Sequence, residues 1–298
     1  MGVEKKIFLV GTGRWANVYL KYATLLKTRL GLAVEKMSTK DYLESSGTNK
    51  SGSERKDKAI IIICNSTSMH YQCARHALNK SDLILTEKPC FKTLEEYEMF
   101  DHLLCTEGIG EKKVFISCPF LFNPKIQQIK KHISNVFVKE LVLNWYDNEG
   151  DLEGKSRDKD TRQTALCHYI PIIGYLMNLE GNGMNLQKIE SDGKETQLRT
   201  AKNKSLIRVN HLLGAKNKAR EIEVVTEGGT TKYDLIEKIN NTRKNNPSRT
   251  DHTEDALYTQ IKEVLKFSRQ VKELAQEERE RVEWALYKTT SINKALVV

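Results

Sequence analysis

Short apolar runs alternate with amphipathic segments over the first 135 residues of the chain. Runs at 6–10, 31–37, 59–64, 82–86 and 113–117 predict strands, and the segments between most of them carry apolar residues at helical spacing. The run at 59–64 holds four consecutive isoleucines and is apolar on both strand faces, which is typical of a parallel sheet covered by helices on both sides. Residues 45–58 are polar and predict a loop, with at most a short or frayed helix beside it. This alternation favours an α/β domain.

The pattern changes after about residue 136. A long strand is predicted at 137–146, and 206–213 and 220–225 alternate as half-exposed antiparallel strands do. Gly228-Gly229 predicts a turn before 230–233, and helical spacing predicts helices at 161–176, 251–276 and 279–287, the second capped by Asp251. Together these segments fit an open sheet with one covered face.

A glycine-rich stretch lies where the first strand turns into the first helix. It reads Val10-Gly11-Thr12-Gly13-Arg14-Trp15-Ala16, a G-x-G-x-x-A pattern. Gly11 allows a sharp turn, Gly13 allows the backbone to approach a pyrophosphate, and Ala16 allows the helix to pack on the strand. The phosphate would rest on the free N–H groups at the helix N-terminus. The alternative is a glycine-rich turn that binds nothing.

Other candidate contacts to a dinucleotide follow the later strands. After the second strand come Ser38-Thr39-Lys40, where hydroxyls and a cation suit a 2′-phosphate and favour NADP. Glu35 is the competing candidate, and it would favour NAD. Ligands of open parallel sheets bind at the carboxyl ends of the strands, so we also expect cofactor contacts after the third strand. These are Asn65, Ser66, Thr67 and His70, although a histidine there is often a surface residue.

Composition narrows the classes of function. A length of 298 residues suggests two domains. No run of about 18 apolar residues and no signal pattern occurs, so we expect a cytoplasmic protein without a membrane span. The six cysteines lack metal-site spacing and are expected to be reduced core thiols, with no metal bound. The net charge of +9 comes from lysines spread among acids, which argues against a nucleic-acid partner.

The tripeptide Glu87-Lys88-Pro89 closes the strand at 82–86, and a Thr93–Glu96 capping box opens the next helix. With the G-x-G turn upstream, this order resembles the Gfo/Idh/MocA family of NAD(P)-dependent oxidoreductases. The resemblance implies a Rossmann domain at 1–119 and an α/β domain at 120–298 with an open, mainly antiparallel sheet. It further implies a homodimer through that sheet and C-terminal helices that fold back on the first domain. Lys88 would lie beside the nicotinamide, and Pro89 would fix the turn, with a cis peptide as one option.

The second domain departs from the family pattern. The family carries Asp-x-Gly-x-His-x-x-Asp on a helix corresponding to 161–176, with the histidine as acid or base. In one register His168 matches that histidine, and Thr164 and Pro171 replace the two aspartates. In the other register His168 takes the first aspartate position. Both registers make His168 a candidate proton donor or acceptor, and the substrate candidates are Phe120, Asn123 and Tyr169.

The expected activity is hydride transfer between a nicotinamide and a small substrate, a sugar or nucleotide-sugar alcohol or ketone. Lys88 orients the substrate and stabilises a developing alkoxide, and His168 or Lys88 moves the proton. The altered histidine motif and the apolar Phe120-Leu121 leave a second option open, reduction of an imine on a less polar substrate. A third option is a non-catalytic NADP-binding regulator, which the intact Glu-Lys-Pro opposes.

Overall fold

The computed structural model describes most of the chain in two compact units. The described residues are 6–45, 59–78, 80–106, 113–148, 161–178, 187–191, 195–199, 205–215, 218–236, 256–268 and 275–287. The first unit holds the described residues up to Pro119 and those from Leu257 to Tyr287, and the second holds those from Phe120 to Ala256.

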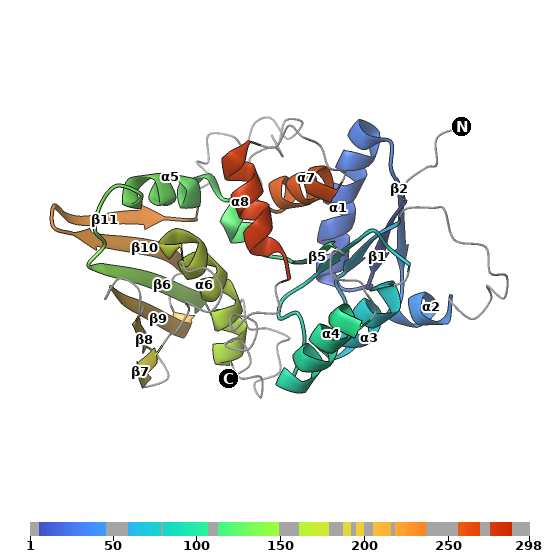
Figure 1. Cartoon of the computed structure of the whole chain (residues 1–298), viewed down its shortest axis with the longest axis horizontal. Helices are drawn as coiled ribbons and strands as arrows, with labels where there is room; N and C mark the ends of the chain where they lie inside the picture. Colours follow the sequence, from blue (N-terminus) through green and yellow to red (C-terminus); the bar gives the residue numbers. More distant parts are fainter. Residues whose placement is uncertain are drawn as a thin grey trace. The chain divides into compact units, whose positions relative to one another are not determined.

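The first unit is built on a parallel five-stranded sheet in the order β2-β1-β3-β4-β5 (Figure 1). Its elements in chain order are β1 (Lys6–Val10), α1 (Arg14–Leu30), β2 (Ala33–Met37), α2 (Thr39–Glu44), β3 (Ala59–Ile63), α3 (Thr67–Leu78), β4 (Leu83–Thr86), α4 (Leu94–Thr106), β5 (Lys113–Ile116), α7 (Ala256–Ser268) and α8 (Gln276–Ala285). The predicted alternation of strands and helices is confirmed. The short helix expected beside the polar loop is α2, which ends directly before the predicted loop at 45–58. Residues 46–58 lie outside the described part.

Both faces of this sheet are buried, as the isoleucine run predicts. Ile61 and Ile63 pack in a cluster with residues of α3 and α4. Ile60 and Ile62 alternate with them, are equally buried, and face the side where α1 lies. The predicted capping box at the start of α4 is formed, since Glu96 N–H donates to Thr93 Oγ1 at 3.2 Å and Thr93 N–H donates to Glu96 Oε2 at 3.3 Å.

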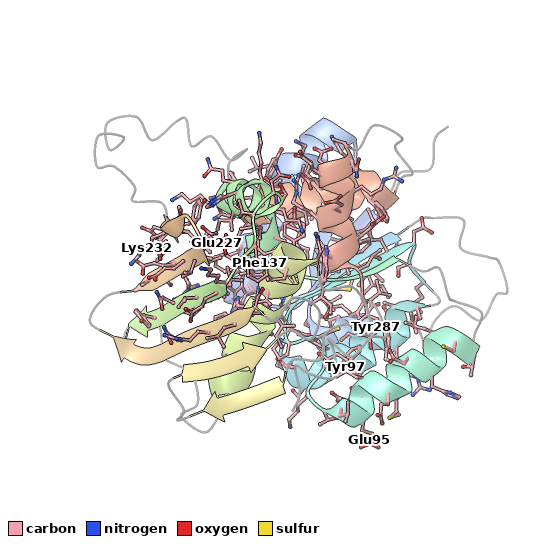
Figure 2. All side chains as sticks on the ribbon, turned by 60° about the vertical axis from the view of Figure 1, so that its left-hand side comes forward. Glu95, Tyr97, Phe137, Glu227, Lys232 and Tyr287 are labelled. Atoms are coloured by element: carbon pink, nitrogen blue, oxygen red, sulfur yellow. The ribbon has the colours of Figure 1, made fainter. Side chains whose placement is uncertain are left out.

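The end of the described chain joins this unit through Tyr287. The prediction of a helix through Tyr287 is wrong at its end, because Leu286 forms an antiparallel bridge with Phe115. The Tyr287 ring stacks on Tyr97 with centroids 6.3 Å apart, and its hydroxyl donates to Asp101 Oδ1 at 2.8 Å (Figure 2). Pairing with the edge strand satisfies backbone groups that one more helical turn would have used.

The second unit is built on a mixed six-stranded sheet in the order β11-β10-β6-β9-β8-β7. Its elements are a 3-10 turn at Pro119–Phe122 that begins at the unit boundary, α5 (Pro124–Ile133), β6 (Glu140–Asn148), α6 (Thr161–Met177), β7 (Gln187–Ser191), β8 (Glu195–Arg199), β9 (Leu206–Ala215), β10 (Ala219–Thr226) and β11 (Gly229–Asp234). The β6–β9 pair is parallel and the other pairs are antiparallel. The sheet is therefore mainly antiparallel, as expected. The predicted strand at 137–146 begins three residues late, and Phe137 is 57% exposed.

One face of this second sheet carries paired polar side chains. Arg208 Nη2 lies 2.9 Å from Glu140 Oε1, and Lys232 Nζ lies 2.7 Å from Glu221 Oε2; Figure 2 labels Lys232. Asn210 Nδ2 donates to Asn144 Oδ1 at 2.7 Å. A homodimer through this face stays a prediction. None of the described helices has the length and apolarity that crossing a membrane requires.

The buried ion pair between Arg281 and Glu263 makes the first unit sensitive to the loss of either partner. Its side chains are 11% and 4% exposed, and the guanidinium donates to both carboxylate oxygens, at 2.8 and 3.2 Å. Arg281→Ala should destabilise the unit by about 3–5 kcal/mol, because it leaves a buried carboxylate without its partner. Urea unfolding followed by circular dichroism measures this, with Glu44→Ala in the exposed Lys40–Glu44 pair as a control that costs less than about 0.5 kcal/mol.

This loss should depend on pH in a defined direction. Burial raises the pKa of the Glu263 carboxyl, and Arg281 opposes that rise. Without Arg281 the pKa in the folded state rises further, so stability is retained below the unfolded pKa and lost as pH increases. The penalty is therefore larger at about pH 8 than at about pH 5. An equal penalty at both values would contradict the assignment.

Candidate functional site

The carboxyl ends of the five parallel strands form one ordered rim. Four of the residues that directly follow strands donate their backbone N–H to the neighbouring strand: Gly11 to Met37, Cys64 to Val10, Glu87 to Ile63 and Ser117 to Thr86, at 2.8–3.0 Å. The chain winds in opposite directions on the two sides of β1, so the strand order reverses there. Open α/β sheets bind ligands in the crevice at such a reversal.

Gly11 lies in backbone contact with the end of β3. Its φ is +145°, and a Cβ at this position would lie 2.9 Å from the carbonyl carbon and oxygen of Cys64. Real side chains do not tolerate that distance. The first glycine of the motif is thus required by contact between two strand ends, in addition to the turn itself.

Gly13 has a different environment. It precedes α1 as the N-cap with φ −74°, and no atom of the described residues lies within 4 Å of a Cβ placed on it. No side chain caps this helix end, and the first turn contains no acid. Ala16 is fully buried, as the packing of α1 on β1 requires, whereas Thr12, Arg14 and Trp15 are exposed. Free N–H donors and open space beside Gly13 fit an anionic group such as a pyrophosphate.

The end of β2 presents a carboxylate. Ser38 is the N-cap of α2, and its hydroxyl accepts from Asp41 N–H at 3.1 Å and donates to Asp41 Oδ2 at 2.6 Å. Lys40 extends into solvent 3.9 Å from Glu44. Glu35 lies in mid-strand, not at the strand end. The hydroxyl expected to meet a 2′-phosphate is therefore engaged with an acid that the sequence interpretation overlooked.

Asn65, at the end of β3, links this strand to α2. Its Nδ2 donates to Thr39 Oγ1 at 2.9 Å and to Cys73 Sγ at 3.3 Å. Ser66 is exposed and Thr67 begins α3. These contacts draw together the predicted candidates that follow β2 and β3.

His70, a predicted cofactor contact, lies inside the first unit. It is buried, Nδ1 lies 3.0 Å from the carbonyl oxygen of Pro89, and Nε2 lies 3.2 Å from that of Asn65. Burial lowers the pKa of His70, although the carbonyl acceptors oppose the shift. With both nitrogens facing backbone oxygens, the ring joins the turns after β3 and β4.

The Glu87-Lys88-Pro89 turn places a carboxylate inside the fold and an ammonium at its edge. Glu87 is buried, and its two oxygens accept from the Tyr19 hydroxyl at 2.5 Å and the Lys88 backbone N–H at 3.1 Å. Lys88 is half-buried and donates through Nζ to the Ser117 carbonyl at 3.3 Å. The Lys88 ammonium thus points to the Ser117 carbonyl and not to Glu87. The peptide bond between Lys88 and Pro89 is cis. Glu87 therefore holds the turn, and its predicted contact with a cofactor stays a prediction.

His168 lies in the second unit among aromatic rings. It stacks on Trp145 with centroids 5.0 Å apart and meets Phe120 edge-on at 5.9 Å. The structure thus brings together two predicted site residues, His168 and Phe120, around a buried tryptophan that the sequence interpretation did not select. Helix α6 continues through Pro171, which has no N–H to donate to the preceding turn.

Two predicted substrate contacts take part in the packing of the second unit, and their substrate roles stay predictions. Asn123 caps α5, where Oδ1 accepts from Lys125 N–H at 2.9 Å and Nδ2 donates to the Leu235 carbonyl at 3.3 Å. Tyr169 is 1% exposed and packs edge-on against Trp145 at 5.1 Å. Tyr169 is buried, whereas Asn123 is half-buried.

Sequence reasoning missed residues whose role depends on long-range contacts. Tyr19 looks like an ordinary helical core residue, and nothing in its neighbourhood signals a partner 68 positions away. Ser117 and Trp145 carried usable signals. Ser117 is the last residue of a predicted strand. Trp145 follows Leu141 and Leu143 at two-residue spacing, which places the three side chains on one face.

The fold is shared with solved dehydrogenase structures of low sequence identity. The myo-inositol dehydrogenase of Lactobacillus casei, in complex with NAD(H) and myo-inositol, matches with a TM-score of 0.61 and 14% identity over 95% of this chain and 91% of that chain. The WlbA (WbpB) dehydrogenase of Thermus thermophilus, in complex with NAD and UDP-GlcNAcA, matches with 0.57 and 16% over 94% and 93%. A myo-inositol dehydrogenase of Corynebacterium glutamicum matches with 0.62 and 17% over 99% and 96%.

No model of a protein family and no curated protein matches the sequence. The structural likeness extends over nearly the full length of these dehydrogenases, so the chain has their fold. It is also the fold implied by the resemblance to the Gfo/Idh/MocA family.

Alanine should destabilise the ligand-free protein much more at Gly11 than at Gly13. Gly11→Ala should destabilise it by about 2 kcal/mol or more, because the new Cβ meets the Cys64 backbone at a φ that disfavours side chains. Gly13→Ala should cost less than about 1 kcal/mol, since its Cβ enters open space. Chemical denaturation of both variants tests this, and equal losses would contradict the described contact.

Proposed function

We propose that the protein is a nicotinamide-dependent oxidoreductase that acts on a hydroxyl or carbonyl group of a sugar-like substrate. The observation that carries the proposal is the uncapped N-terminus of α1 beside Gly13, together with Lys88 on the same carboxyl rim of the parallel sheet. The fold of the dehydrogenases described above supports it.

The rim offers complementary contacts for the parts of a dinucleotide. Backbone N–H groups at the start of α1 suit the pyrophosphate, because the helix dipole and unpaired donors both favour an anion. Asp41, in the first turn of α2 after β2, suits the adenosine ribose hydroxyls. The bound nicotinamide would accept or supply the hydride.

Lys88 is the residue we assign to the reacting oxygen. Its backbone is fixed by the Glu87 carboxylate, and the Ser117 carbonyl directs its ammonium. An ammonium held in this way stabilises negative charge that develops on a substrate oxygen without further reorganisation. His168 remains our candidate for proton transfer, within an aromatic environment that suits the apolar face of a sugar ring or inositol ring.

For the cofactor we propose NAD in preference to NADP. The sequence alone favoured NADP through Ser38-Thr39-Lys40. The Ser38 hydroxyl, however, is bonded to the Asp41 carboxylate, and that negative charge would repel a 2′-phosphate while accepting hydrogen bonds from a ribose diol.

Replacing Lys88 separates the enzyme from a non-catalytic cofactor-binding protein. Lys88→Ala should lower kcat by roughly 100-fold or more and leave the NADH dissociation constant within about 3-fold, because the ammonium acts on the reacting oxygen. Turnover is followed by nicotinamide absorbance with myo-inositol, scyllo-inositol and a UDP-sugar, and binding by energy transfer from Trp15, which is 53% exposed at the start of α1. Cofactor binding without any Lys88-dependent turnover would favour a regulator.

Removing the charge at Asp41 should shift the choice of cofactor. Asp41→Asn should raise the affinity for NADPH relative to NADH by roughly 10-fold, since the like charge facing a 2′-phosphate is lost. Glu44→Gln makes the same charge change one turn later on α2 and should shift the ratio much less. Calorimetric titration of both coenzymes measures it. A wild-type preference for NADPH would contradict the assignment of Asp41.

A further inference from the structure

A chain of buried polar groups connects α1 to Lys88. Tyr19, Ser117 and Gln260 are 0% exposed and Glu87 is 8% exposed. The Tyr19 hydroxyl lies 2.5 Å from Glu87 Oε1 and 2.6 Å from Ser117 Oγ. These groups come from a helix, two strand ends and a C-terminal helix, so no local pattern in the sequence joins them.

The direction of the hydrogen bonds follows from the available protons. Burial and the neighbouring Glu87 carboxylate raise the pKa of Tyr19 well above its ordinary value, so the phenol keeps its single proton. Hydrogen bonds to a charged acceptor are the stronger ones, and the phenolic proton therefore goes to Glu87. The Ser117 hydroxyl can then donate to the phenolic oxygen.

The Glu87 carboxylate links the Tyr19 hydroxyl to the backbone of Lys88. Its second oxygen accepts the Lys88 backbone N–H at 3.1 Å. With one oxygen held by Tyr19 and the other holding residue 88, Glu87 has little freedom to rotate. The position of the Lys88 backbone is therefore tied, through a single carboxylate, to a side chain of α1.

We propose that Tyr19 is a positioning residue that sets Lys88 relative to the bound dinucleotide. This inference rests on the proposed function, because its consequence for activity requires that α1 hold the cofactor. Tyr19 lies in the second turn of the helix whose first turn offers the phosphate donors. Helix α1 then determines the positions of both the cofactor and Lys88. The ammonium and the nicotinamide therefore keep a fixed relative position. Small displacements at such distances cost much of the rate.

Amide hydrogen exchange tests the link without any ligand. Tyr19→Phe should speed exchange of the Lys88 amide by roughly 10-fold, because its acceptor carboxylate loses a fixing bond. Glu87→Ala should speed it as well, and adding Tyr19→Phe to Glu87→Ala should give no further increase. Tyr22→Phe is the matched control, a buried tyrosine of the same helix whose loss of hydroxyl should leave the Lys88 amide within about 2-fold.

Activity provides the second measurement. With the substrate that turns over fastest among the two inositols and the UDP-sugar, Tyr19→Phe should lower kcat by roughly 10- to 100-fold and change the NADH dissociation constant by less than about 3-fold. Unchanged exchange at Lys88 overturns the proposal, as does an additive effect in the Glu87→Ala background. So does a loss of kcat matched by an equal loss of NADH binding, which would indicate a structural role alone. Failure of the wild-type protein to bind NADH or NADPH contradicts the proposed function, and the exchange measurement still decides whether Tyr19 fixes Lys88.

Discussion

The backbone contact between Gly11 and the end of β3 determines the geometry of the candidate site. A residue with a Cβ would collide with the Cys64 carbonyl, so the two strand ends approach this closely only with glycine. The approach lets the chain turn from β1 into α1 within three residues, the last of which, Gly13, is the N-cap of the open helix end. The position of every donor in the first turn of α1 follows from that contact.

Buried charge in the first unit is compensated in two ways. Glu263 is held by an arginine through two hydrogen bonds, a pair that keeps its charge neutralised inside the unit. Among the described residues, Glu87 is held by a phenol and a backbone N–H, and the ammonium of Lys88 points to the Ser117 carbonyl. A direct ion pair would have occupied the lysine. The hydrogen-bonded arrangement is the one compatible with a lysine that acts on a substrate.

The second unit keeps the dehydrogenase fold while its chemistry differs from the family pattern. Its covered sheet face places Trp145 against His168 and Phe120, where the family motif would place carboxylates around a histidine. The rings of Trp145 and Phe120 give His168 an aromatic surrounding that suits apolar contact with a ring-shaped substrate of the proposed kind. The chain is 12–17% identical to proteins of the same fold. A fold can be kept while the side chains at a candidate site change.

The sequence by itself determined the order of elements in the first unit, because apolar runs and capping residues act locally. It also identified Gly11, Gly13 and the Glu-Lys-Pro turn as a candidate site. It did not reveal β7 and β8, whose short polar strands pair only with distant partners, nor the extended end at Tyr287. Tertiary structure alone decided the contacts of His70, Asn123 and Tyr169 inside the fold, and the hydrogen bond between Asp41 and Ser38. It also joined Tyr19 to Glu87, since hydrogen bonds between residues far apart in the chain exist only once the strands are assembled.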